Sequence, residues 1–150
     1  MPALHASLLL LAVAAGAGLA FQAVINTRLS AALGSPLWAA VVQVFAGLVF
    51  LLACVLILRQ PPPSLAGASR LPWWIWTGGA IGAAYVLTVI VTTRPLGVTL
   101  MVAAVIVGQS VAALLIDHVG LFGVDVHRLT PVRLLGVGLL FAGVVLVRWR

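Results

Sequence analysis

The chain has 150 residues, of which 64% are hydrophobic and only 7% are charged, and it contains neither Lys nor Glu. Soluble domains contain roughly 45–50% apolar and about 25% charged residues, so this composition excludes a surface that faces mainly water. The net charge of +6 comes from eight Arg against two Asp, but the arginines stand singly between apolar runs, which excludes a clustered nucleic-acid-binding patch.

Five apolar segments are long enough to cross a bilayer, because a helix needs about 20 mostly apolar residues to span about 30 Å of hydrocarbon. The first segment could be a signal peptide, but its start lacks a clear basic region and four more spans follow, so we expect a retained helix. The sequence therefore predicts an all-α membrane protein with one five-helix transmembrane domain over residues 1–150. The predicted helices cover residues 4–33, 37–58, 73–93, 98–117 and 132–148.

Capping residues mark two of the predicted helix starts. Ser35-Pro36 and Thr130-Pro131 each place a hydroxyl before a proline at the first helical position, which is a typical helix start. Gly34 suits the end of the first helix. Prolines 61–63 close the second helix, because proline cannot continue the backbone hydrogen-bond ladder.

Three tryptophans stand where the third helix enters the membrane: Trp73, Trp74 and Trp76. This position is typical of an aromatic belt at the membrane surface; a stacking platform for a ligand is the alternative. Cys54, the only cysteine, lies inside the second apolar segment, so no disulfide can form within the chain and no metal motif is present. We expect no cofactor.

The arginines divide equally between the two sides of the membrane. Five spans put the termini on opposite sides, and the excess of Arg and Lys on one side normally sets the orientation. Here the N-terminal side has four arginines and the other side has four, so the rule gives almost no instruction. Either some arginines are buried and should not be counted, or the chain inserts both ways up and opposite copies pair. The N-terminal side carries residues 59, 70, 128 and 133, and the other side 28, 94, 148 and 150.

Motifs along the whole chain resemble one family of membrane proteins. They are FQAVINTRLS, WTGGAIGAAYV, RPLGVTL, VGQSVAALLIDHVGLFG and RLLGVGLLFAGVVLV, in that order. In order and length the chain is similar to the five-helix, single-domain exporters of the bacterial inner membrane within the drug/metabolite transporter superfamily (EamA-like). The resemblance implies a half-transporter that pairs, as an antiparallel homodimer or with an opposite-facing paralogue, into an inverted-repeat transporter.

The same resemblance leaves the substrate and the coupling ion open. The four-helix multidrug relatives carry a membrane-embedded Glu in their first helix. In this chain the first helix offers Gln22 and Asn26 instead, and there is no Glu anywhere. A drug–proton exchange of that type is therefore not expected.

Polar residues inside the spans are the candidate cavity residues, because polar groups are costly in lipid. Gln109 and Ser110 lie near the middle of the fourth span, and an antiparallel pair would bring both copies of Gln109 close to its two-fold axis. Gln can donate and accept hydrogen bonds, which suits a polar substrate. The alternative for every such residue is a hydrogen bond that joins helices. The remaining candidates are Tyr85, Thr88, Gln43, Gln22 and Asn26.

Asp117 ends the fourth helix, so two antiparallel copies would hold it near opposite membrane faces. We expect it to anchor the structure, either by pairing with an arginine such as Arg133 or Arg94 or by bonding the turn His118-Val-Gly; proton or cation handling is the alternative. His118 can titrate near neutral pH but is expected to lie at the interface. Arg94 precedes Pro95, where a break in the helix could help to bind an ion, although a plain loop is the simpler interpretation.

Small residues predict close helix contacts. Gly78 and Gly82 form a GxxxG motif that Gly79 extends, and this face is expected to pack within the subunit. Gly138 and Ala142 form a second pair, which we expect at the dimer contact.

The function predicted is a small secondary transporter of a polar or amphipathic molecule, working by alternating access. A dual-topology channel, or a membrane subunit that stabilises a larger complex without transporting, are the alternatives. No nucleophile–base pair or metal cluster is present, so we expect no enzyme. The partners expected are the lipid bilayer, a second copy or paralogue, and a small molecule.

Overall fold

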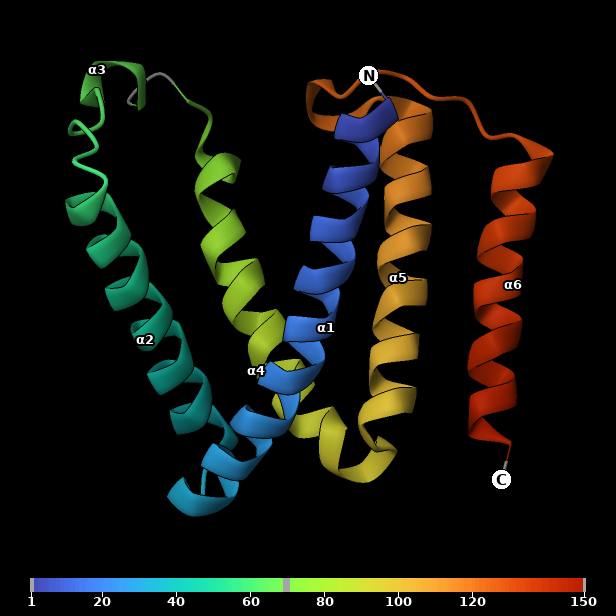
Figure 1. Cartoon of the computed structure of the whole chain (residues 1–150), viewed down its shortest axis with the longest axis horizontal. Coiled ribbons are helices and arrows are strands. Elements are labelled where there is room, and N and C mark those ends of the chain that lie inside the picture. Colours follow the sequence, from blue (N-terminus) through green and yellow to red (C-terminus); the bar gives the residue numbers. More distant parts are fainter. Residues whose placement is uncertain (1, 69–70, 150) are drawn as a thin grey trace. The chain divides into compact units, whose positions relative to one another are not determined.

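The computed structural model describes residues 2–68 and 71–149, and within these residues every regular element is a helix (Figure 1). Five helices are long and apolar enough to cross a membrane, which confirms the five predicted spans. The elements are α1 (Pro2–Leu33), α2 (Pro36–Ile57), α3 (Leu65–Ala68), the 3₁₀ helix η1 (Trp73–Thr77), α4 (Gly78–Leu96), α5 (Val98–Val119), the 3₁₀ helix η2 (Leu121–Gly123) and α6 (Pro131–Arg148).

The predicted helix starts are confirmed at atomic detail. The Ser35 hydroxyl accepts a hydrogen bond from the Trp38 amide at 3.3 Å, and the Thr130 hydroxyl accepts one from the Arg133 amide at 3.3 Å. Each helix then begins with a proline, whose missing N–H would have had no partner there. Gly34 has a φ of +66°, a conformation open to Gly, and it ends α1.

The third span is longer than the sequence predicts. The expected end was residue 93, but α4 continues through Pro95 to Leu96. Proline lacks an N–H donor and its ring crowds the carbonyl four residues earlier, but here the helix continues past it until Gly97, at a φ of +77°, ends it. The prediction that a plain loop follows Arg94 was therefore wrong.

Residues 1–94 and 95–150 form two compact units. In the first, the short Gly34–Ser35 turn joins α1 to α2, and these two helices pack against each other (Figure 1). Their junction holds a small buried cluster of Ala39, Ala40 and Ile90 from α4. Alanines let the helices approach closely. Leu29, Val86 and Leu87 surround the cluster.

In the second unit α5 and α6 pack side by side and antiparallel (Figure 1). Two hydrogen bonds join the segment that connects them to the C-terminal end of α5. The His127 amide donates to the Asp117 carbonyl at 2.8 Å, and the Leu129 amide donates to Nδ1 of His118 at 3.5 Å. This fixes where α6 begins relative to the end of α5.

Gly120 is the residue on which this connection depends, and Gly120→Ala should destabilise the fold. It closes α5 at a φ of +68°, and a Cβ there would lie 2.7 Å from Cγ2 of Val126 and 3.2 Å from the Val124 carbonyl oxygen. A left-handed non-Gly residue costs roughly 1–2 kcal/mol before any clash. We expect the free energy of unfolding in detergent to fall by at least about 1 kcal/mol.

The matched control is Gly136→Ala inside α6, where a Cβ would meet nothing within 4 Å. Alanine favours a helix interior over Gly by roughly 0.5–1 kcal/mol, so this variant should be as stable as the parent or more so. Equal stability of the two variants would show that the left-handed turn at Gly120 does not constrain the fold.

Candidate functional site

The candidate polar residues lie at different depths of the spans. Gln109 is within one residue of the midpoint of Val98–Val119, and Tyr85 is within one residue of the midpoint of Trp73–Leu96. At 1.5 Å rise per residue, Gln22 and Gln43 lie roughly 5 Å from the midpoints of their spans, and Asn26 roughly 11 Å. All five therefore fall within the hydrocarbon depth of an untilted helix.

Their surroundings differ as much as their depth. Gln109 and Thr88 are exposed, whereas Tyr85, Gln22 and Gln43 are half-buried. The Thr88 hydroxyl donates to the Ala84 carbonyl at 2.8 Å, so it serves its own helix. Ser110, next to Gln109, is half-buried on a different side of α5. The structure thus gives no single cluster of these residues within either unit.

Asn26 is the most completely buried of the candidates, at 2% exposure. Among the described residues no donor reaches its side-chain oxygen Oδ1. The other buried polar side chain among the described residues, Thr93, donates its hydroxyl to the Val89 carbonyl at 2.6 Å. A buried acceptor without a partner costs free energy, so such a group in a native fold calls for an explanation.

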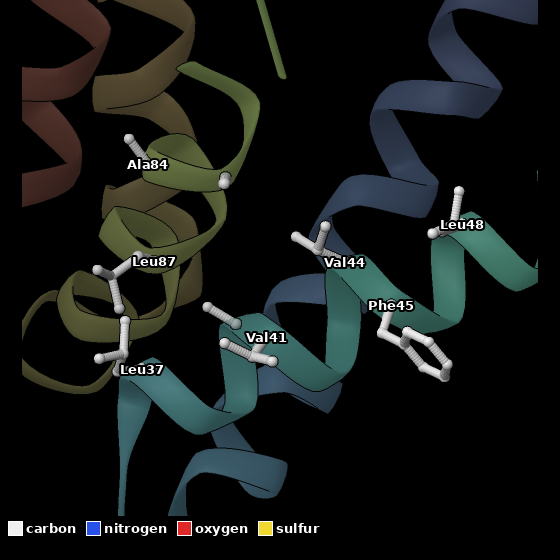
Figure 2. Close-up of a pocket in the computed structure, with 9 residues that line it drawn as sticks. Leu37, Val41, Val44, Phe45, Leu48, Ala84 and Leu87 are labelled. Atoms are coloured by element: carbon white, nitrogen blue, oxygen red, sulfur yellow. The ribbon is translucent and has the colours of Figure 1, made fainter. Parts of the chain in front are cut away.

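An apolar pocket of about 450 Å³ lies between α2 and α4. Figure 2 shows the side chains that line it, with Leu37 and Phe45 from α2 and Leu87 from α4 among them. Its volume is that of a small-molecule site. None of the polar candidates lines it, so it can hold the apolar part of a ligand but offers no polar group to orient one.

A second groove, of about 330 Å³, lies between α5 and α6 and holds an ion pair. Asp117 Oδ2 and Arg133 Nη1 are 3.3 Å apart, with the side chains 33% and 39% exposed respectively. Of the two partners considered from the sequence, the structure thus selects Arg133. Ser110 lines the same groove, two turns of α5 below Asp117. His118 is exposed beside the pair, and its role in the fold is the hydrogen bond from Leu129.

A third, more polar pocket of about 250 Å³ lies where α1 ends, α2 begins and α4 ends. Arg94 lines it together with Thr27 and Ser30 from α1. The sequence interpretation missed these two hydroxyls. Thr27 directly follows Asn26, and Ser30 lies three residues further on. This spacing was the available signal, since residues three and four apart share a helix face.

The glycines predicted to make close helix contacts make no such contact among the described residues. A Cβ placed on Gly78, Gly79, Gly82 or Gly138 would meet no heavy atom within 4 Å, and Ala142 is exposed. Their packing role stays a prediction.

Among residues 2–68 and 71–149, no three His, Cys, Asp or Glu side chains are grouped closely enough to hold a metal ion.

Comparison with known proteins gives one positive result. The family model described as "Putative inner membrane exporter, YdcZ" matches residues 7–146, which is nearly the whole chain. The comparisons with curated proteins and with solved structures give no match.

The burial of Asn26 predicts an uncommon result for Asn26→Leu. The substitution keeps a similar shape and removes the unpartnered acceptor, so the free energy of unfolding should stay equal or rise by up to about 1–3 kcal/mol. Thermal unfolding of the purified protein in detergent measures this. As a control, Ala39→Leu in the buried cluster of α2 adds volume to a fully buried position and should destabilise by roughly 1–3 kcal/mol. A large loss of stability in Asn26→Leu would mean that the amide has a structural partner.

Proposed function

The chain belongs to this family of inner-membrane exporters, and on that premise we propose that it is a small secondary transporter rather than an enzyme, moving a polar or amphipathic small molecule by alternating access. The observation that carries the proposal is Gln109. It is exposed at the middle of a membrane span, where lipid cannot satisfy its amide. A second protein surface or a water-filled path has to cover it, and a transporter provides both.

The proposed assembly is an antiparallel pair of chains, either two copies or a copy and an opposite-facing paralogue. The equal division of arginines that the sequence predicts supports this assembly, and the described helices keep the five spans on which that count depends. An equal division favours neither orientation. Two opposite copies would then be related by an axis in the membrane plane, the symmetry on which alternating access is built in inverted-repeat transporters.

Within this proposal the polar residues have separate roles. Gln109 and Tyr85 are placed at the depth of the two-fold axis and contact the substrate, with Gln22, Gln43, Thr88, Ser110 and Asn26 as further cavity residues. The pair Asp117–Arg133 anchors α6 to α5 near one membrane face. Both of its side chains are about one-third exposed, so the ion pair adds little to the free energy of unfolding. Its role is to hold α6 in position against α5.

Dual topology predicts labelling from both sides of the membrane. In a Cys54→Ala background, Gln60→Cys in the loop after α2 and Trp149→Cys near the C-terminus each introduce one exposed thiol. We expect a membrane-impermeant maleimide to label each position in comparable amounts from outside and from inside. Overwhelming labelling from one side would exclude the antiparallel homodimer and point to an opposite-facing paralogue or to a parallel assembly.

Loss of the midplane amide should abolish export without loss of assembly. Cells that overproduce the protein are compared with cells that overproduce Gln109→Leu, and the medium is analysed by mass spectrometry. We expect compounds that accumulate with the parent protein to fall at least about tenfold, the effect of losing one good polar contact. Gln60→Leu, the same change outside the spans, is the control. If Gln109→Leu lowers the amount of dimer while export per dimer is unchanged, the residue only joins helices.

A further inference from the structure

The polar pocket at the end of α4 is lined by a cation, Arg94, that has no acidic partner among residues 2–68 and 71–149. The chain has two Asp and no Glu, and the only ion pair among the described residues joins Asp117 to Arg133. The described part of the chain likewise offers Arg94 and Ser30 no hydrogen-bonding partner. A guanidinium, with five N–H donors in a fixed fork, and a free hydroxyl therefore line the same small cavity.

The position of the pocket places it at the level of the lipid headgroups. Arg94 is two residues from the end of its span, and the Gly34–Ser35 turn that borders the pocket joins two span ends. Trp38, exposed in the first turn of α2, is the kind of residue that marks the membrane–water interface. Basic pockets between helices at this depth attract anionic headgroups.

The lining contains acceptors as well as donors. The Thr27 hydroxyl donates to the Ala23 carbonyl at 2.7 Å, so only its lone pairs are left for a ligand. Val91 also lines the pocket, and its carbonyl lacks the usual donor because residue 95, four positions on, is proline. Both α1 and α4 thus contribute a donor and an acceptor to the lining, which suits a phosphate that carries a hydroxyl or amine group, rather than a bare apolar tail.

The volume restricts the ligand further. About 250 Å³ is below the roughly 300–1,000 Å³ of pockets for drug-sized molecules, but it is several times the roughly 30 Å³ that one water occupies. We propose that the pocket formed by Thr27, Ser30, Val91 and Arg94 binds a phosphate group, with Arg94 and Ser30 as donors to its oxygens. The group belongs to an anionic phospholipid headgroup or to a soluble phosphate compound.

Saturable binding measured with two probes tests the proposal on the purified full-length protein in a neutral detergent. One titration uses short-chain phosphatidylglycerol, with short-chain phosphatidylcholine to correct for detergent-like effects, and the other uses sodium phosphate at constant ionic strength. The thermal midpoint is followed in each, because a ligand that binds only the folded state raises it. Saturation by the lipid alone assigns the site to a headgroup; saturation by phosphate, with competition between the probes, assigns it to a soluble phosphate. Either result supports the phosphate site.

Variants decide whether Arg94 makes the site. Arg94→Gln should weaken the apparent affinity at least about tenfold, as expected for a charged hydrogen-bonding partner, and Ser30→Ala should weaken it a few-fold. Arg28→Gln is the matched control. Arg28 is an exposed arginine near the end of α1, the helix that carries Ser30, and it does not line the pocket. Its affinity should change less than about twofold, because exposed charges contribute little.

Arg94→Lys keeps the positive charge but loses the planar guanidinium group, which can donate two parallel hydrogen bonds. This variant replaces Arg94→Gln in the test if Arg94→Gln does not fold. We expect it to bind a few-fold more weakly than the parent. Two results would overturn the proposal: no saturation by either probe, or equal effects of the Arg94 and Arg28 variants, which would show general attraction between the basic protein and anions.

Discussion

In a bilayer the backbone has no water to bond, so every peptide group in a span must find its partner within its own helix. This constraint explains why all regular elements among residues 2–68 and 71–149 are helical. It also explains where the chain turns. Gly34, Gly97 and Gly120 each end a spanning helix with a positive φ, a conformation that glycine adopts without strain and that stops the helix at the end of its span.

The same constraint changes what holds the helices together. Lipid is as apolar as leucine, so burying leucine gains little, and association depends on close packing and polar contacts. The core of residues 1–94 accordingly consists of Ala39 and Ala40 against Ile90, while large apolar side chains cover the outside. A polar residue in a span is then more informative than an apolar one, because an unsatisfied amide, such as that of Asn26 or Gln109, is the costly exception.

Sequence reasoning predicts what depends on local chemistry. The five spans follow from length and hydropathy, and the caps Ser35 and Thr130 follow from a hydroxyl before proline. It does not predict burial, which depends on the side of a helix that its neighbours cover. Gln22 and Asn26 share a face of α1, yet one is half-buried and the other is enclosed.

Contacts between distant residues are the other part that the sequence leaves open. Arg94 and Ser30 are 64 positions apart, and only the meeting of α1, α2 and α4 shows that they line one pocket. The partner of Asp117 also needed the structure. Arg133 and Arg94 were both considered from the sequence, and the connection after α5, bonded back through His127 and Leu129, brings Arg133 within reach.

The scarcity of acidic residues links the two proposals. With one described ion pair and eight arginines, most guanidinium groups must find their counter-charge outside the chain, and at a membrane surface this means lipid phosphates or solvent anions. In the proposed topology the arginines divide equally between the two sides, so neither face is preferred on charge. If copies do insert both ways, each pair carries an Arg94 pocket at both membrane faces. Phosphate binding at Arg94 would then stabilise the two orientations alike, because each copy meets the headgroups of its own leaflet through the same residues.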